Sequence, residues 1–278
     1  MQLTIESVEK LLQIALSEDY GIGGDITSQY TIDKNKEVSF KINAREDLIL
    51  CGSDIANYFI KKHSSIKSKN YYMDAETVRK GEVIISGQGF AHEVMLLERV
   101  ILNFLQHLSG VSTVTGKYVE QTQKTKAKIF DTRKTTPGLR SLQKYAVRCG
   151  GGHNHRLALD SGVMIKDNHI AICGSITKAV TKARSCKPHY LTIEVECDSL
   201  EQVKEAVECK VDIIMLDNMT LKQMSEAVLL INNTAIVEAS GNVSLNNVKD
   251  IAKTGVDVIS VGKITHSAPS VDIGLDIL

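Results

Sequence analysis

Basic side chains gather around one short stretch of this sequence, DTRKTTPGLR at residues 131–140. Arg133 and Lys134 directly follow AKIF at 127–130, an apolar run that is typical of a buried strand. Arginine can bind a carboxylate or phosphate through two parallel hydrogen bonds, and lysine adds a mobile point charge. A cationic pair at the end of a buried strand therefore indicates a site for an anion.

Polar or glycine residues follow all six apolar runs in this part of the chain. The runs are AKIFD (127–131), GVMIK (162–166), LTIEVE (191–196), DIIMLD (212–217), AIVEAS (235–240) and DVISVG (257–262). At their ends stand Asp131, Thr132, Arg133 and Lys134, then Lys166, Glu196 and Asp217, then Ser240, Gly241 and Asn242, and finally Val261, Gly262 and Lys263. In β/α barrels the carboxyl ends of the strands meet at one mouth, where active sites form. Six such ends favour a shared site over chance.

The residue types at these ends suit two tasks. Lys166 adds positive charge to that of Arg133 and Lys134, so this cluster suits an anionic ligand. Glu196 and Asp217 carry hard carboxylate oxygens on neighbouring strands, which suit a Mg²⁺ ion shared with a polyphosphate. An ion pair with the nearby lysines is the alternative explanation for the two acids.

The glycines at the last two strand ends also have two interpretations. SGN at 240–242 and VGK at 261–263 allow a ligand to approach the backbone closely. Late barrel strands often form a phosphate site from loop amides and a helix N-terminus. A tight turn between strand and helix would explain a single glycine loop equally well.

The segment RCGGGHNHR at 148–156 adds two histidines and an arginine beside three glycines. The HxH pattern can mark a metal site, but the chain has no further Cys or His at a spacing typical of zinc. We interpret His155 and Arg156 as ligand contacts and His153 as a structural histidine.

Three basic residues before this segment, Arg140, Lys144 and Arg148, recur at helical spacing opposite apolar positions. This pattern predicts a solvated helix face that raises the local positive potential.

The elements that must position these residues form two regions. The first 90 or so residues alternate helix-like and strand-like patterns, which predicts a small mixed α and β domain. A long apolar helix is predicted at 92–109, with a buried stripe formed by Leu97, Ile101, Phe104, Leu105 and Leu108. Arg99 lies on another face of this helix, either in a packed interdomain or subunit contact or in a functional role.

From residue 127 onward, near-continuous apolar runs alternate with helical segments such as 199–208 and 221–231. This alternation predicts a parallel sheet buried on both faces. Spacings of roughly 20 to 30 residues suit a β/α barrel or part of one.

Composition narrows the class of protein. The 278 residues contain 33 Lys plus Arg and 33 Asp plus Glu, so a broad nucleic-acid-binding face is not favoured. No apolar run approaches the length of a membrane span. The N-terminal residues carry Glu6 and Glu9 and lack the basic and apolar regions of a signal peptide. Six scattered cysteines without a CxxC pattern indicate reduced thiols in a cytoplasmic protein.

The residues alone thus indicate an enzyme that binds a small anionic substrate together with a phosphate compound, with Mg²⁺ as cofactor. They do not name the reaction. One alternative is a barrel aldolase that uses Lys166 as a Schiff-base nucleophile. Another is a catalytically silent phosphate-binding module, which the two acids Glu196 and Asp217 argue against.

Seven blocks of the sequence resemble the quinolinate phosphoribosyltransferases, also called nicotinate-nucleotide pyrophosphorylases (carboxylating). The blocks are ERVILNFLQHLSG (98–110), DTRKTTPGLRSLQKYAVRCGGGHNHR (131–156), IKDNH (165–169), EVE (194–196), MLDN (215–218), EASGN (238–242) and GVDVISVGKITHS (255–267). They occur in the order and spacing of the family, and the resemblance covers nearly the whole chain.

This resemblance implies an N-terminal α/β sandwich domain and a C-terminal open, incomplete α/β barrel. We expect the sandwich domain at 1–109, the barrel at 110–267, and a C-terminal tail at about 268–278 that packs back on the first domain. The implied reaction joins quinolinate and phosphoribosyl pyrophosphate (PRPP), with Mg²⁺, to give nicotinate mononucleotide, pyrophosphate and CO₂ in de novo NAD biosynthesis.

The resemblance also implies roles for single residues. Quinolinate would be bound by Thr132, Arg133, Lys134, His155, Arg156, Lys166 and, from the partner subunit of a homodimer, Arg99. PRPP would be bound by Lys134, Lys166, Glu196, Asp217, Ser240, Gly241, Asn242, Val261, Gly262 and Lys263, with Glu196 and Asp217 also facing the Mg²⁺ ion. Assembly beyond the dimer stays open.

Two positions depart from the family pattern. Asn242 stands where many members have Gly, and Lys263 where many have Ala. Neither change removes a backbone amide, so we expect phosphate binding to survive. A related transferase that takes nicotinate without decarboxylation is the nearest alternative, and the additional Arg and His contacts favour a dicarboxylate instead.

Overall fold

The computed structural model describes residues 5–278, with side chains from Val8 onward. The first four residues of the predicted N-terminal domain and the side chain of Glu6 lie outside the described residues. Unit 1 contains the described residues up to Gly116 together with Thr136–Gly151 and Ser267–Leu278. Unit 2 contains Lys117–Thr135 and Gly152–His266.

Unit 1 is built on a four-stranded antiparallel sheet with the strand order β12-β1-β5-β3. Its strands are β1 (Glu37–Ala44), β3 (Lys67–Asn70), β5 (Val83–Phe90) and β12 (Ile273–Ile277), and β2 (Leu48–Ile49) pairs separately with β4 (Thr77–Val78). Phe40, Ile42 and Ala44 of β1 are buried, as the two-residue period of this segment predicts. β12 pairs with β1 from Phe40↔Ile277 to Ala44↔Ile273, so the last residues complete this sheet.

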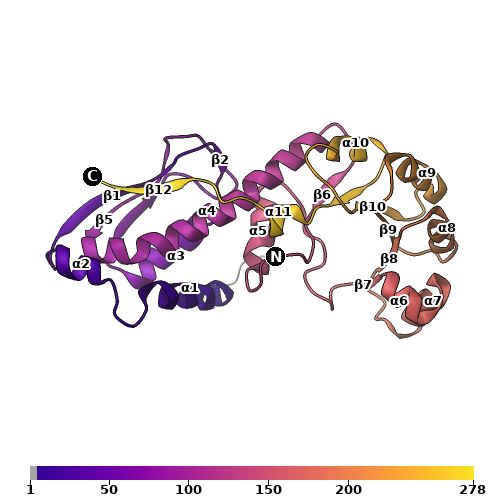
Figure 1. Ribbon diagram of the computed structural model, residues 1–278, viewed down its shortest axis with the longest axis horizontal. Coiled ribbons are helices and arrows are strands. Elements are labelled where there is room, and N and C mark those ends of the chain that lie inside the picture. Colours follow the sequence, from indigo (N-terminus) through magenta and orange to yellow (C-terminus); the bar gives the residue numbers. More distant parts are fainter. Residues whose placement is uncertain (1–4) are drawn as a thin grey trace. The chain divides into compact units, whose positions relative to one another are not determined.

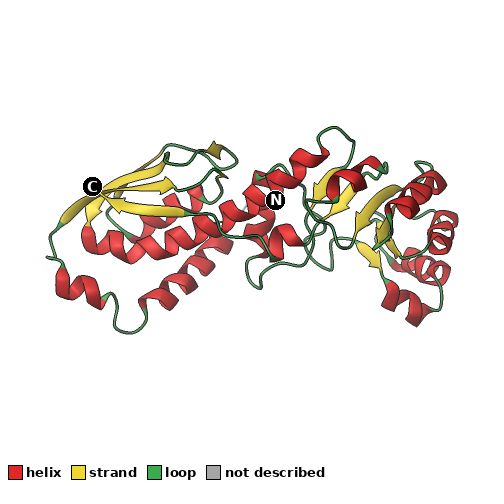
Figure 2. Ribbon diagram, turned by 45° about the horizontal axis from the view of Figure 1, so that its top comes forward, coloured by secondary structure: helices red, strands yellow, loops and turns green. Residues whose placement is uncertain are grey.

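Helices α3 and α4 lie on one face of the unit 1 sheet (Figures 1 and 2). The helices of this unit are α1 (Ile5–Tyr20), α2 (Ile26–Thr31), α3 (Ser53–His63), most of α4 (Ala91–Thr122) and α5 (Arg140–Cys149). The apolar stripe predicted for α4 is buried at Leu97, Ile101, Leu105 and Leu108, whereas Phe104 is half-buried. The helix also continues to Thr122, well past the end predicted at residue 109.

The prediction of a solvated basic face on α5 is wrong for Lys144. This side chain is 2% exposed, and its neighbours Gln143 and Val147 are also buried, whereas Arg148 is exposed. The helix therefore packs over more of its circumference than its apolar residues indicate. Its end also meets α4 closely, because a Cβ atom added at Gly150 would lie 2.3 Å from the Ser112 carbonyl oxygen.

Unit 2 contains a six-stranded parallel sheet with the order β6-β11-β10-β9-β8-β7. The strands are β6 (Lys128–Phe130), β7 (Val163–Ile165), β8 (Ile193–Cys197), β9 (Ile213–Asp217), β10 (Ile236–Ser240) and β11 (Val258–Ser260). The helices are α6 (Asp167–Cys173), α7 (Ile176–Cys186), α8 (Leu200–Glu208), α9 (Leu221–Ile231), α10 (Val248–Lys253) and α11 (Lys263–His266). All six apolar runs form strands, and β6 and β7 are the two edges, so the barrel is open. This confirms the predicted architecture.

Local sequence signals start the helices that follow these strands. Ser199 and Thr220 accept hydrogen bonds from the backbone amides of Gln202 and Gln223 and so cap α8 and α9. Figure 1 shows α7, α8 and α9 along one side of strands β8, β9 and β10. Parallel pairing of the strands places their carboxyl ends at one edge of the sheet. None of the described helices has both the length and the apolar character needed to cross a membrane.

Candidate active site

A pocket of about 480 Å³ lies in unit 2 at the carboxyl ends of the parallel strands. This volume falls within the range typical of small-molecule sites. Eleven residues predicted to bind substrate line it: Thr132, Arg133, Lys134, His155, Arg156, Lys166, Glu196, Asp217, Ser240, Gly241 and Asn242. The structure thus brings together residues that are spread over more than 100 positions of the sequence.

The segment after β6 is held beside the returning glycine-rich segment. Asp131 is fully buried and accepts hydrogen bonds from Asn154 Nδ2 at 2.6 Å and from the His155 amide at 2.9 Å. His153 forms a parallel bridge with Phe130, and the two rings stack at 5.2 Å. Asp131 and His153 therefore have structural roles that place the neighbouring basic residues side by side.

The two arginines of the pocket favour an anionic ligand. Burial lowers the pKa of Arg156, and the nearby positive charge of Arg133 lowers it further. The Arg156 guanidinium is oriented by the Gly162 carbonyl oxygen at 3.1 Å and by Met164 Sδ at 3.4 Å. The Glu194 carboxylate acts in the opposite direction and raises the pKa of Arg156. A bound carboxylate or phosphate would further offset the repulsion between the two arginines.

The acids predicted to face a metal ion lie in the same pocket wall. Glu196 forms an ion pair with Lys166, because Lys166 Nζ contacts Glu196 Oε2. Asp217, at the end of β9, accepts a hydrogen bond from Asn218 Nδ2 at 2.7 Å. The ion-pair alternative considered for the two acids therefore applies to Glu196.

The loop after β10 takes a left-handed backbone that its sequence allows. Gly241 has φ 89°, and a Cβ atom there would lie 2.2 Å from Asn218 Oδ1. Asn242 has φ 51°, a conformation that asparagine tolerates better than most residues with a side chain. Its Nδ2 donates to Asn218 Oδ1 at 3.0 Å, which ties the β9 and β10 loops together.

Four predicted site residues do not line this pocket. The amide of Val261 donates to the Phe130 carbonyl oxygen at 2.9 Å, so strand pairing already uses it. Gly262 precedes α11, and Lys263 is the exposed first residue of that helix. Arg99 lies in unit 1, exposed on α4, where it lines a separate hollow of about 470 Å³ with residues that include Asp25 and Glu98.

Other residues around the pocket were not predicted from the sequence. The lining also includes Met164, Met215, Asn218, Glu238 and Ser260. Buried Glu194 lies behind them, in the same alternating position of β8 as Glu196. An acid two residues before Glu196 inside an apolar strand was a usable signal, because alternate residues of a strand share a face.

His155 bridges these buried acids to the pocket. Its Nε2 lies 3.3 Å from Glu194 Oε2 and 3.5 Å from Glu238 Oε1. Burial opposes a charge on the ring, but the hydrogen bonds to Glu194 and Glu238 outweigh it and raise the pKa of His155 to about 9. The Arg156 amide donates to Nδ1 at 2.7 Å and opposes a second proton. Nε2 carries a proton in either charge state, and that proton faces the carboxylates.

Comparison with known proteins agrees with this geometry. Residues 25–109 match the family described as quinolinate phosphoribosyl transferase, N-terminal domain, and residues 111–276 match its C-terminal domain. A Bacillus subtilis protein named probable nicotinate-nucleotide pyrophosphorylase [carboxylating] is 42% identical over 97% of this chain and 93% of its own length.

Solved structures are similar over the whole chain. The nicotinate-nucleotide pyrophosphorylase of Ehrlichia chaffeensis has a TM-score of 0.94 at 43% identity and covers 100% of both chains. That of Francisella tularensis has a TM-score of 0.95 at 41% identity and covers 100% of this chain and 98% of its own. Both domain matches and these full-length similarities lead to one conclusion: the chain belongs to the quinolinate phosphoribosyl transferase family.

Proposed function

We propose that the pocket of unit 2 is the active site of a pentosyltransferase of NAD biosynthesis. The reaction joins the phosphoribosyl group of PRPP to quinolinate and gives nicotinate mononucleotide, pyrophosphate and CO₂. The observation that carries the proposal is the grouping of Arg133, Arg156 and Lys166 with Glu196 and Asp217 around one pocket. The curated relatives named for this activity support it.

The cationic part of the pocket is the proposed site for quinolinate. Arg133 and Arg156 each suit one carboxylate, because a guanidinium can donate two parallel hydrogen bonds. Thr132, Lys134 and Lys166 line the same wall and supply further donors. The backbone amide of Arg156 donates to His155 Nδ1, so His155 supports the backbone of Arg156. The His155 side chain also forms part of the pocket wall.

The other side of the pocket is the proposed site for PRPP. The loop Ser240–Asn242 lines this side and offers backbone amides to a phosphate. Lys134 and Lys166 balance the negative charge of the diphosphate. We propose that Val261, Gly262 and Lys263 complete the phosphate site, although they lie outside the pocket wall as it stands.

The acids of this side fit a Mg²⁺ ion. Glu196 and Asp217 present carboxylate oxygens to one pocket, and Mg²⁺ commonly takes one or two protein carboxylates together with substrate phosphates and water. Glu196 would exchange its contact with Lys166 for the metal, which frees the lysine for substrate. When bound, the ion neutralises charge that develops on the departing pyrophosphate.

The residues of the chain contribute to the reaction by binding and orientation. The arginines hold the two carboxylates so that the pyridine nitrogen lies near the ribose C1, while the loop at 240–242 holds the phosphate end. Bond formation makes the ring nitrogen cationic, and the adjacent carboxylate then leaves as CO₂. Arginines suit this task because they bind the carboxylates without protonating the ring nitrogen.

We further propose a homodimer in which Arg99 reaches the pocket of the partner subunit. An exposed arginine on α4, outside its own subunit's pocket wall, supports this arrangement. Assembly beyond the dimer and the cytoplasmic location stay predictions. The aldolase alternative is disfavoured, because a Schiff-base lysine must act as a neutral amine and Lys166 Nζ contacts a carboxylate.

The test is an assay with Mg²⁺, PRPP and quinolinate labelled in the 2-carboxylate. Labelled CO₂ and nicotinate mononucleotide should appear in equal amounts. A parallel reaction with nicotinate in place of quinolinate is the control, and it should give far less nucleotide. Faster turnover of nicotinate would contradict the dicarboxylate assignment, and absence of either product from folded protein would overturn the proposal.

A further inference from the structure

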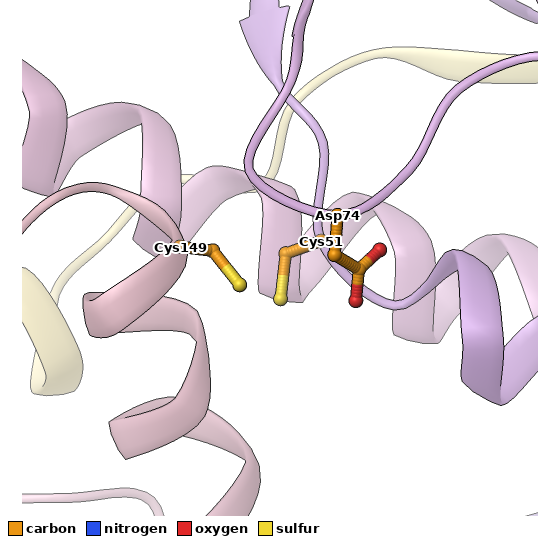
Figure 3. A group of neighbouring side chains, drawn as sticks. All are labelled: Cys51, Asp74 and Cys149. Carbon is orange, nitrogen blue, oxygen red and sulfur yellow. The ribbon is translucent and has the colours of Figure 1, made fainter.

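Three side chains of unit 1, none of which lines the pocket, form a cluster that the proposed reaction does not use. They are Cys51, Asp74 and Cys149, and their sulfur and carboxylate atoms all lie within 4.8 Å of one another. Figure 3 shows the two sulfur atoms pointing toward each other, with the Asp74 carboxylate on the far side of Cys51. The two cysteines are separated by 98 positions in the sequence (149 minus 51).

Helix α4 holds both cysteines in place. The Cys51 amide donates to Ser109 Oγ at 3.0 Å, and Ser109 Oγ donates to the Cys51 carbonyl oxygen at 3.2 Å. One turn later, α4 meets the end of α5, where Gly150 approaches the Ser112 carbonyl oxygen too closely to carry a side chain. The backbone at or next to each cysteine is therefore held against the same helix.

A second link joins the two segments beside the thiols. Tyr145, one turn before Cys149 on α5, donates its hydroxyl hydrogen to Asp74 Oδ2 at 2.9 Å. Asp74 also accepts hydrogen bonds from the amides of Gly52 and Ser53 at 3.0 and 2.8 Å and from Ser53 Oγ at 2.7 Å. Its oxygens thus already bind four donors, and a metal ion would have to displace some of them. The hydrogen bonds of Asp74 therefore disfavour a metal site. The two sulfur atoms remain as the part of the cluster that can react.

From this geometry we propose that Cys51 and Cys149 are a redox-active thiol pair, which a hydroperoxide converts into an intramolecular disulfide and a thiol reductant restores. The sulfur atoms need to approach from at most 4.8 Å to about 2.05 Å. In reducing compartments such bonds are commonly transient and redox-sensing.

The chemistry has two balanced steps. The Cys149 thiol first gives up its proton, and the thiolate attacks a peroxide oxygen, which breaks the O–O bond and leaves a sulfenic acid at Cys149. The hydroxide or alkoxide that departs takes up that proton and becomes water or alcohol. The Cys51 thiol then attacks that sulfur, forms the S–S bond and releases a second water molecule. In total two thiols lose two hydrogens, and one molecule of hydroperoxide is reduced.

The two thiols differ in the way these steps require. Cys149 is partly exposed, and its hydrogen bond with Cys51 lowers its pKa, so it is the thiolate that meets the oxidant. Cys51 is 0% exposed, and burial raises its pKa. Cys51 is therefore protected from direct oxidation and suits the resolving role.

The test maps the bond in the intact wild-type protein. Reduced protein is treated with hydrogen peroxide, its remaining thiols are blocked with N-ethylmaleimide, and it is digested without reductant for mass spectrometry. A Cys51–Cys149 linked peptide should appear, vanish after phosphine reduction, and be accompanied by a higher melting temperature that reduction reverses. Full alkylation of both cysteines after peroxide treatment would overturn the proposal, as would Cys149 linked to another cysteine or stoichiometric zinc in the purified protein.

Three variants test which cysteine acts in each step of the oxidation. Cys51→Ser should accumulate a sulfenic acid at Cys149 that dimedone traps, and Cys149→Ser should leave Cys51 unreacted. Cys186→Ser removes an exposed cysteine of unit 2 and should form the linked peptide as wild type does. Oxidation of Cys51 in the Cys149→Ser variant at the wild-type rate would contradict the assigned order. None of these readouts depends on transferase activity, so they stand apart from the proposed function.

Discussion

The pocket of unit 2 and the thiol cluster of unit 1 are both assembled from distant residues, but by different means. In the pocket, parallel strands bring successive strand ends to one edge, so each polar residue needs only to follow its own strand. In the thiol cluster, two unrelated segments pack on α4 and bring Cys51 and Cys149 together. The first arrangement repeats a rule of the fold, whereas the second depends on single contacts.

The charges of the two regions differ as well. The pocket gathers arginines and lysines near acids, and the charge of Arg133 lowers the pKa of Arg156, so the pocket suits an anionic ligand. The cluster around Asp74 satisfies its own hydrogen bonds and needs no ligand. We therefore expect removal of a charged pocket side chain to reduce activity with little loss of stability, and removal of a hydrogen bond to Asp74 to reduce stability with little loss of activity.

The largest effect is expected for Arg156→Ala. Loss of a partly buried charged partner costs about 2–5 kcal/mol, which is at least a roughly 30-fold weaker affinity for quinolinate. Steady-state kinetics with quinolinate varied, together with urea unfolding, would measure the change. The matched control is Arg184→Ala on α7 of the same unit, which should keep the wild-type affinity for quinolinate. Equal affinities of the Arg156→Ala variant and the wild type for quinolinate would show that Arg156 does not bind this substrate.

A smaller but more specific effect is expected for Gly241→Ala. Its φ of 89° disfavours a side chain, and the new Cβ would collide with Asn218. We expect roughly 1–3 kcal/mol of strain and a KM for PRPP that rises more than the KM for quinolinate. Gly81→Ala is a close control, because Gly81 has φ 88° with open space around it. An unchanged KM for PRPP would show that this loop does not bind the phosphate of PRPP.

In the thiol cluster, Tyr145→Phe removes one hydrogen bond to Asp74 and should cost about 0.5–1.5 kcal/mol of unfolding free energy. Turnover under reducing conditions should stay at the wild-type level. Tyr71→Phe provides the control, since its hydroxyl contacts Ser86 Oγ at 3.3 Å on the exposed surface. A loss of activity without a loss of stability would reverse the contrast between the two regions.

The smallest effect concerns the pH dependence of Cys149. Because its pKa is lowered, its thiolate fraction at pH 7 exceeds that of an ordinary cysteine and falls off only at lower pH. The alkylation rate of Cys149 relative to N-acetylcysteine should therefore increase as pH falls from 9 to 7. Peptide-resolved labelling with iodoacetamide measures this ratio, and a ratio that stays constant or decreases would contradict the predicted direction.

Sequence patterns predicted the strands and most of the pocket because both follow from local rules. A buried parallel strand is an apolar run, and the residue after it lies at the edge of the sheet. Glu194 and Glu238 escaped prediction because an acid inside an apolar run does not reveal its partner, and only the folded structure shows that both meet His155. Lys144 escaped because helical periodicity does not reveal how many faces a helix buries.

The resemblance to a family supplied what local rules could not, namely the reaction and the expected part of Arg99. Neither the local sequence rules nor the family resemblance predicted the thiol pair. Cys51 and Cys149 come from segments with no common pattern. Their meeting depends on the contact of Cys51 with Ser109 Oγ and on the close approach of Gly150 to the Ser112 carbonyl oxygen. Such contacts are decided by packing in three dimensions.

The pairing of β12 with β1 has a consequence for synthesis of the protein on the ribosome. Residue 277 pairs with residue 40, so the unit 1 sheet lacks one strand until a further 237 residues (277 minus 40) have been translated. Unit 2 ends at His266, and its six strands can emerge and pair before β12 does. During translation the β12 edge of β1 would thus remain open while β6 to β10 are made. An unpaired strand edge is prone to aggregation, so chaperones that protect such edges would bind at β1 during this interval.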